Sequence, residues 1–378
     1  MHPEFPHQDM IHLNHAAVGP WPLRTAEAVT AFARENAVSG SRHYAQWLKV
    51  EAATRALAQG VIGAEDAADI AFVKNTSEAL SIVAFGLPWS AGQNIVIPRG
   101  EFPSNRVVWL MAAERFGLEV REVELPFDAP EDALLAACDP RTTLLSCSAV
   151  QFASGLRMDL HRLGTALHRR GILFCVDAIQ HLGALPFDAR AVEADFVMAD
   201  AHKWLLAPEG IALFYVRPAL RDRLILQEFG WHMLADSGDY SSYALTMAED
   251  ARRFEPGSPN LLGIHALHAS LSLLQEVGLD QIAAAIDDRW QRLHDGLRSL
   301  DCEILTPPAR HAGILTFRPA HEDTEALFRR LQDAGVLCAK RGGGIRFSPH
   351  FYLPLDSLDE ALAVVAEGTG SGVGTLAP

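Results

Sequence analysis

A lysine placed between two apolar segments is the first residue of this sequence that could do chemistry. The stretch 194–217 reads as a strand, a short turn with His202, Lys203 and Trp204, and a second strand. A buried ammonium group is costly unless it is paired or neutralised. A lysine with a lowered pKa forms an imine with an aldehyde, so covalent chemistry is one interpretation. The other is a surface lysine whose alkyl stem packs on Trp204.

Other candidate side chains stand just after apolar runs that are typical of buried strands. Thr76 and Ser77 follow one run, Phe102 follows the next, and Asp177 ends a third, 26 residues (203 − 177) before the lysine. In a mainly parallel sheet the ligand lies at the carboxyl ends of the strands, so these side chains are expected to meet. Taken singly, each is more often structural, as a helix cap or a loop anchor.

This set of residue types is complementary to pyridoxal phosphate (PLP). PLP needs a lysine for its aldehyde, an anionic partner for its pyridine nitrogen, a group that stacks on its ring and a phosphate site. Lys203 is predicted to form the imine, and Asp177 is predicted to pair with the pyridinium nitrogen. Phe102 can cover one face of the ring.

The remaining contacts of such a cofactor and of its substrate have candidates as well. A helix capped by Thr76 or Ser77 would offer free N–H groups to the phosphate. Gln180 can hydrogen-bond the ring hydroxyl, and Arg346 can hold a substrate carboxylate in a bidentate fork. Because these residues occur together and in this order, a PLP site is favoured over unrelated structural roles.

Strands alternate with helices through more than half of the sequence, which predicts an α/β fold with a mainly parallel sheet and helices on both faces. We expect a large PLP-binding domain over 15–265 and a small α+β C-terminal domain over 266–367. The stretch 261–300 has the apolar spacing of a long helix. The N-terminal segment 1–14 is expected to pack on the small domain, and 368–378 to form a flexible tail.

The composition limits the class of protein. A net charge of −15 argues against a surface for nucleic acid or for anionic membranes. No signal peptide or membrane-spanning run is evident and the five cysteines form no CxxC pair, so the cytoplasm is the expected compartment. No HExxH, paired Cys/His set, GxSxG or P-loop occurs, so no metal site is predicted.

The motifs around these residues resemble the class V aminotransferase family of fold-type I PLP-dependent enzymes. The family includes cysteine desulfurases, C–S lyases and isopenicillin-N-epimerase-like proteins. The resemblance runs from Asn14 to about His350, with the motifs LNHAAVGP, FVKNTSEAL, VDAIQ, AHKWLLAPEG, FEPGSPN and IRFSPH in the order of the family. It implies a mainly parallel seven-stranded sheet flanked by helices, with a small α+β C-terminal domain.

The resemblance gives each cofactor candidate a role. Lys203 matches the Schiff-base lysine, and Asp177 matches the partner of the pyridinium nitrogen. The further contacts that it implies are Thr76, Ser77 and His202 on the phosphate, Gln180 on the phenolic oxygen, and Phe102 and Gln151 at the ring.

The resemblance also bears on the substrate and on a partner subunit. Arg346 matches the arginine that binds the substrate carboxylate. Other residues expected on the substrate side are Asn14, His15 and Ala17. Gly257 and Ser258 match a position that reaches the phosphate of the neighbouring subunit, which implies a homodimer with shared active sites.

Three positions depart from the desulfurase branch of the family. Phe102 stands where that branch has a histidine, and Asp200 stands where it has a serine on the phosphate. Because an aspartate would repel a phosphate, we expect Asp200 to point elsewhere. Cys338 is the only cysteine near the place of the persulfide loop and reads as a strand position, so sulfur relay through a protein thiol is not expected.

The predicted function is that of a PLP-dependent enzyme on a small amino acid, which displaces Lys203 from the cofactor to form an external aldimine. The freed Lys203 would act as general base on the α-proton. C–S or β-lyase chemistry and aminotransferase chemistry are favoured. The alternatives are an epimerase-like enzyme or a cysteine desulfurase without an evident persulfide cysteine. From another class, a non-catalytic ligand-binding module on the same fold stays open, as does the substrate side chain.

Overall fold

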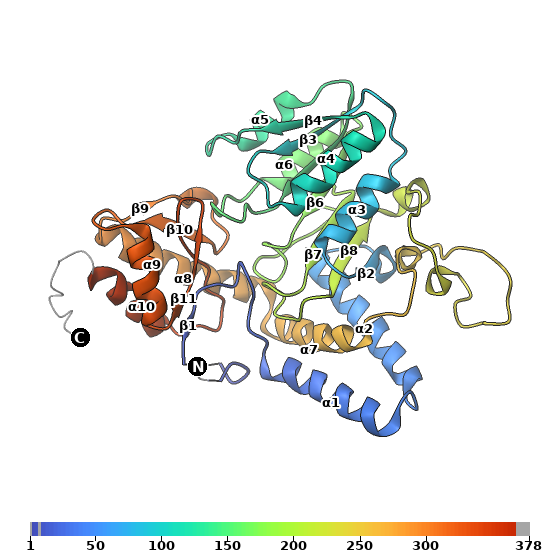
Figure 1. Cartoon of the computed structure of the whole chain (residues 1–378), viewed down its shortest axis with the longest axis horizontal. Coiled ribbons are helices and arrows are strands. Elements are labelled where there is room, and N and C mark those ends of the chain that lie inside the picture. The colour runs from blue at the N-terminus through green and yellow to red at the C-terminus, as the bar shows by residue number, and fades with distance from the viewer. Residues whose placement is uncertain (1, 7–8, 368–378) are drawn as a thin grey trace.

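The structure is a computed structural model that describes residues 2–6 and 9–367. The predicted tail at 368–378 lies outside the described residues. Figure 1 shows one large sheet with helices on both sides, and a second, smaller sheet that carries its own helices near the C-terminus. None of the helices in the described ranges is long and apolar enough to cross a membrane.

The large sheet has seven strands in the order β2-β8-β7-β6-β5-β3-β4. Its members are β2 (Ile70–Val73), β3 (Asn94–Pro98), β4 (Glu119–Val123), β5 (Thr142–Ser148), β6 (Leu173–Asp177), β7 (Phe196–Asp200) and β8 (Ala212–Val216). Only β8 runs antiparallel to its neighbours. The predicted mainly parallel seven-stranded sheet is therefore confirmed.

Helices cover both faces of this sheet because successive strand side chains point to opposite faces. On β3, Ile95 and Ile97 pack against the helices α3 (Thr76–Gly86) and α4 (Ser104–Phe116), and Val96 packs on the other side. The helices of that other side are α2 (Tyr44–Ile62), α5 (Pro130–Ala137) and α6 (Leu160–His168), with α1 (Leu23–Ser39) and α7 (Leu261–Val277) packed on α2 or on each other. Both faces of each central strand are therefore buried.

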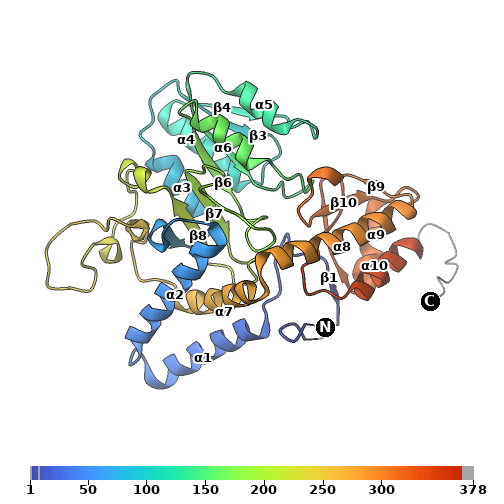
Figure 2. The same ribbon diagram turned by 180° about the vertical axis from the view of Figure 1, so that it is seen from behind.

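The predicted long helix over 261–300 is wrong in one respect. It is two helices, α7 and α8 (Leu279–Ser299), separated by Gly278 with a φ of 88°. A positive φ is incompatible with a continuous right-handed helix, and glycine adopts it without steric cost. Both views show α8 running from the end of α7 into the C-terminal group of elements (Figures 1 and 2).

The C-terminal group contains a four-stranded sheet in the order β12-β13-β10-β9. Its elements are β9 (Glu303–Ile304), β10 (Leu315–Arg318), β12 (Ala339–Arg341), β13 (Gly344–Phe347), α9 (Thr324–Asp333) and α10 (Leu355–Glu367). Near the N-terminus, β1 (Ile11–His12) pairs in parallel with β11 (Val336–Leu337). The boundary at 265/266 falls within α7, and the division into domains stays a prediction.

Short 3-10 helices join these elements. They are η1 (Ala67–Asp69), η2 (Pro218–Arg223), η3 (Trp231–Met233), η4 (Ala251–Phe254) and η5 (Pro308–Arg310). Between η3 and η4 the chain projects from the body as an extended loop in both views (Figures 1 and 2).

Candidate active site

A cavity of about 270 Å³ lies at the carboxyl ends of the parallel strands, where the two sheets approach each other. Its lining comes from the ends of β5, β6 and β7, the start of α3, and the strands β12 and β13. The residues that line it are Ala16, Ala17, Asn75, Thr76, Ser77, Phe102, Ser104, Ser148, Phe152, Asp177, Ile179, Gln180, Asp200, His202, Lys203, Arg341 and Arg346. Residues far apart in the sequence thus meet at one edge of the sheet.

Lys203 stands in the turn that follows β7 and is only 8% exposed. Within residues 2–6 and 9–367 its Nζ makes no hydrogen bond or ion pair, and it lies 5.5 Å from the centre of the Phe102 ring. Burial lowers the pKa of Lys203 to about 8, opposed by the charge of Asp177 and assisted by that of Arg346. A larger fraction of this amine is therefore neutral and nucleophilic near neutral pH.

Asp177 ends β6 and is buried in the same cavity. One carboxylate oxygen accepts a hydrogen bond from the N–H of Ile179 (3.0 Å), and the other accepts one from Nδ2 of Asn105 (2.6 Å). Burial raises the pKa of Asp177, against the effect of these bonds and of the charge of Lys203. A buried carboxylate of this kind is stabilised by a cation, such as a protonated ring nitrogen, at close range.

The start of α3 offers an anion site. Asn75 caps the helix, and its side-chain oxygen accepts from the N–H of Glu78 (2.9 Å). The N–H groups of Thr76 and Ser77 come before the first intrahelical bond, and both residues line the cavity. His202 also lines the cavity, and its Nδ1 lies 3.2 Å from Oδ1 of Asp200.

The expectation that Asp200 points away from a phosphate stays a prediction. Asp200 lines the cavity, and its backbone N–H donates to Oγ1 of Thr76 (3.2 Å). Its Oδ1 accepts from the N–H of Ala201 (3.1 Å) and faces His202. These contacts use part of the hydrogen-bonding capacity of the Asp200 carboxylate, so the carboxylate can lie next to an anion site without facing the anion directly.

Arg346 occupies the opposite side of the cavity, on β13, and is 2% exposed. Its Nη1 donates to the carbonyl of Phe152 (2.6 Å), and its Nη2 reaches Oδ1 of Asn14 only at 3.4 Å. Its Nε is buried without a partner in the part of the chain that the structure describes. Burial, assisted by the nearby charge of Arg341, lowers the pKa of Arg346 to about 10. The Nε–Nη2 edge is therefore free to bind a carboxylate.

Comparison with known proteins identifies the group to which this arrangement belongs. The sequence matches the family model Aminotransferase class-V over residues 11–349. The chain belongs to the aminotransferase class-V family. It is 30% identical to a cysteine desulfurase of Klebsiella pneumoniae, over 92% of this chain and 86% of that protein.

Solved structures share the fold of this class V chain. The apo cysteine desulfurase of Thermococcus onnurineus NA1 has a TM-score of 0.84 at 24% identity, over 95% of this chain and 94% of the other. A mutant of C-DES with glycine covalently linked to the PLP cofactor has a TM-score of 0.89 at 22% identity, over 95% and 97% of the two chains. The complex of the cystine C–S lyase C-DES with its product cysteine persulfide has a TM-score of 0.88 at 22% identity, over 95% and 98%.

This class V protein is a PLP-dependent enzyme. The residues present fit the cofactor. A buried lysine without a partner, a buried carboxylate at the end of β6 and the capped start of α3 line one cavity. They correspond in chemistry to the aldehyde, the pyridine nitrogen and the phosphate of PLP.

Not every predicted site residue of this class V enzyme lines the cavity. Gln180 does, with Nε2 on the carbonyl of Ala16 (2.9 Å), and Ala17 does as well. Gln151 lies outside it and donates to the carbonyl of Gly100 (2.7 Å). His15 is buried beside it, with its ring nitrogens 2.9 Å from the carbonyl of Ser348 and 2.7 Å from the hydroxyl of Tyr352.

Gly257 and Ser258, which we expected at the phosphate of a partner subunit, are exposed and lie outside the cavity of their own chain. Asn14 does not line the cavity either and contacts it through Arg346. The roles of all these residues stay predictions.

Sequence reasoning noted Ser148 as a polar residue after a strand but missed three residues in or beside this site: Glu101, Asn105 and Arg341. Asn105 binds Asp177 directly, and Arg341 lines the cavity beside Arg346. Asn105 stands three positions after Phe102 at the start of a predicted helix, so a search for polar groups in the first turn after each strand would have found it.

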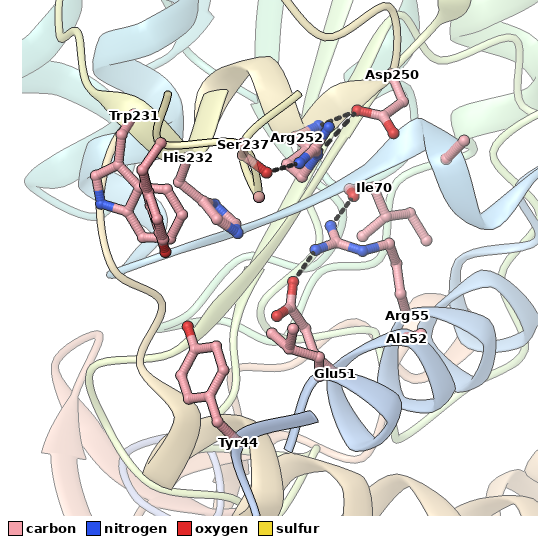
Figure 3. Close-up of a pocket in the computed structure, with 14 residues that line it drawn as sticks. Tyr44, Glu51, Ala52, Arg55, Ile70, Trp231, His232, Ser237, Asp250 and Arg252 are labelled. Carbon is pink, nitrogen blue, oxygen red and sulfur yellow. Dashed lines mark hydrogen bonds and ion pairs between the residues drawn. The ribbon is translucent and has the colours of Figure 1, made fainter. Parts of the chain in front are cut away.

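A second cavity, of about 290 Å³, lies between α2 and the segment that carries η3 (Figure 3). Tyr44, Trp231 and His232 line this cavity and not the one around Lys203. Glu51, His232 and Glu255 come within 4.8 Å of one another there. The guanidinium of Arg55 bonds both carboxylates, to Glu51 at 2.8 Å and to Glu255 at 2.6 Å, so half of their negative charge is already compensated.

Proposed function

We propose that this PLP-dependent enzyme is a C–S lyase that eliminates a sulfur group from the β-carbon of a small amino acid. The observation that carries the proposal is the meeting of Lys203, Asp177 and the free edge of Arg346 in one cavity. When bound, PLP supplies an electron sink for the pair of electrons left at the α-carbon. The Klebsiella relative is a cysteine desulfurase and C-DES is a cystine C–S lyase, which supports a sulfur-containing substrate.

Each residue of the site has a separate role in the proposed reaction. The free edge of Arg346 binds the substrate carboxylate and orients the α-carbon. Lys203, with its pKa lowered to about 8, takes the α-proton as a general base and can pass it to the leaving sulfur. Asp177, held by Asn105 and Ile179, keeps a proton on the ring nitrogen. Thr76 and Ser77 bind the phosphate, and Gln180 binds the phenolic oxygen.

The state of the cysteines favours a lyase over sulfur relay. All five, Cys138, Cys147, Cys175, Cys302 and Cys338, are buried and unpaired. Burial raises the pKa of every one of these thiols, that of Cys338 to about 12. Because the thiolate is the nucleophile, none of these cysteines is prepared to accept sulfur from the substrate.

The test is an assay of the PLP-loaded enzyme with L-cysteine, L-cystine and thioether amino acids. We expect sulfide, thiol or persulfide together with an equal amount of keto acid and ammonia, without added amino acceptor. Keto acid formed only when an amino acceptor is present, and without sulfur release, would show an aminotransferase instead.

The enzyme is also proposed to be a homodimer with shared active sites, in a reducing cytoplasm. Gly257 and Ser258 are exposed, and so are the apolar side chains of Ile225 (59%) and Phe229 (69%). Five unpaired thiols fit a reducing compartment. Mass measured by light scattering tests the dimer. Activity restored by mixing inactive Lys203→Ala and Ser258→Trp chains would support shared sites, and failure of a proven mixed dimer to recover activity would contradict them.

A further inference from the structure

A buried carboxyl group that the mechanism does not use lies behind the site. Glu101, in the loop between β3 and α4, is 7% exposed and does not line the cavity. Its two oxygens are bonded to one residue, since Oε1 accepts from the N–H of Ser148 (2.7 Å) and Oε2 accepts from Oγ of Ser148 (2.6 Å). The titratable groups that act on it are Asp177 and the thiol of Cys147.

Ser148 connects this carboxyl group to Asp177 through Asn105. Nδ2 of Asn105 donates to Oγ of Ser148 (3.3 Å) and to Oδ2 of Asp177 (2.6 Å). Ser148 ends β5 and is paired in register with Asp177 at the end of β6, which fixes the separation of the two. Glu101, Ser148, Asn105 and Asp177 therefore form one continuous hydrogen-bonded chain, which we call the Glu101 chain.

Hydrogen-bond chemistry gives the Glu101 chain a direction. An ionised carboxylate only accepts, so the hydroxyl proton of Ser148 points to Glu101 and its oxygen is left to accept. Both amide protons of Asn105 are then used, one on Ser148 and one on Asp177. Oδ1 of Asn105 is buried without a partner in the part of the chain that the structure describes. The orientation of the amide is therefore set by its two acceptors alone.

We propose that Glu101 is a positioning residue that orients the amide of Asn105 and so keeps Asp177 ionised toward the ring nitrogen of PLP. The inference rests on the proposed role of Asp177. A glutamine at position 101 can still accept from the N–H of Ser148, but its NH2 group donates to the hydroxyl oxygen. The hydroxyl proton then turns to Asn105, and the amide reverses so that its oxygen faces Asp177. Asp177 must be protonated to donate a hydrogen bond to that oxygen. A neutral Asp177 no longer stabilises the proton on the ring nitrogen.

The experiment measures the protonation of the ring directly. Wild type, Glu101→Gln and Asp177→Asn are loaded with PLP that carries ¹⁵N at the pyridine nitrogen, and ¹⁵N spectra are recorded at about pH 8. Burial raises the pKa of Glu101 to about 7, so this carboxyl group is mainly ionised there. We expect a protonated nitrogen in wild type and a shift toward the unprotonated value in Glu101→Gln. The dissociation constant of PLP, measured by tryptophan fluorescence, is expected to rise about ten-fold, which corresponds to about 1.4 kcal/mol.

Two variants separate positioning from folding. Glu131→Gln removes another buried carboxylate, which pairs with Arg310 away from the cavity, and should leave the ¹⁵N signal unchanged. Ser148→Ala removes only a hydroxyl and is expected to move the signal in the same direction as Glu101→Gln. Adding Glu101→Gln to Ser148→Ala should cause no further shift.

Three results would overturn the inference. A protonated nitrogen in both Glu101→Gln and Ser148→Ala would show that the Glu101 chain does not act on Asp177. Additive shifts in the double variant would show that Glu101 acts by another path. A wild-type spectrum equal to that of Asp177→Asn would refute the proposed role of Asp177 itself, and this inference with it.

Discussion

Replacement of Arg346 by glutamine tests how the substrate is held. Nη1 is already bound to the carbonyl of Phe152, whereas Nε has no partner among residues 2–6 and 9–367 and Nη2 has only a 3.4 Å contact to Asn14. A carboxylate bound at the Nε–Nη2 edge gains two charge-assisted hydrogen bonds of about 1.5–3 kcal/mol each. Glutamine keeps one neutral donor worth about 1 kcal/mol, so we expect a loss of about 2–5 kcal/mol, or about 30- to 4,000-fold in kcat/KM.

The division of this loss between kcat and KM is informative. The carboxylate does not change during the reaction, so its binding is equal in the ground and transition states and the loss should appear as a higher KM. Steady-state kinetics on the best sulfur amino acid measure both constants, with Arg318→Gln on the neighbouring strand β10 as control. A fall in kcat with unchanged KM would refute the reasoning, since it would mean that Arg346 acts on the reacting bonds.

Three further outcomes are expected. Lys203→Ala should abolish turnover and the borohydride-fixed PLP adduct seen by mass spectrometry, whereas the exposed Lys49→Ala should keep both. The Cys338→Ser variant should release sulfur at the wild-type rate, because the buried thiol has no part in the reaction. A rate more than ten-fold lower in a folded variant would instead support sulfur relay through this thiol. In the PLP-free protein the pKa of Lys203 is lowered to about 8 from 10.5, so the unfolded state binds more protons between these values. Thermal stability should therefore gain a contribution as pH rises from 8 to 10.5, and Lys203→Met should remove that contribution.

The sequence predicted the parts of the site that depend on local pattern. An apolar run that ends in a polar residue gave the strand end at Asp177, because strands buried on both faces are continuously apolar. The polar run before an apolar segment gave the start of α3 to within two residues, but the cap is Asn75 and not Thr76 or Ser77. The topology then places these ends side by side without further information from the sequence.

What the sequence could not give is the partner of a side chain across the fold. Gln151 carries an amide suited to a cofactor ring, but that amide bonds the loop at Gly100. His15 bonds Ser348 and Tyr352, more than 330 residues away. Asp200 is held by bonds to Thr76 and Ala201, and neither bond has a signal in the sequence.

The turn at Lys203 is held by parts of the chain that lie near both ends of the sequence. The N–H of Gly19 donates to the carbonyl of His202 (2.8 Å), and a Cβ at Gly19 would lie 2.4 Å from the carbonyl oxygen of Lys203. Gly183, with a φ of 91°, approaches the carbonyl of Trp204 as closely, and a ring nitrogen of His350 lies 3.2 Å from that carbonyl. Glycine is needed at these two approaches because no side chain fits.

These contacts explain how a buried lysine can be kept in one place. A partnerless ammonium group would favour any local opening that exposes it to water. The carbonyls of the turn are held by the N-terminal segment and by His350, whose pKa burial lowers to about 3 and whose ring is therefore neutral. Opening the turn would break contacts with both segments at once. The position of Lys203 is thus a property of the whole chain, which is consistent with a family match that extends from residue 11 to residue 349.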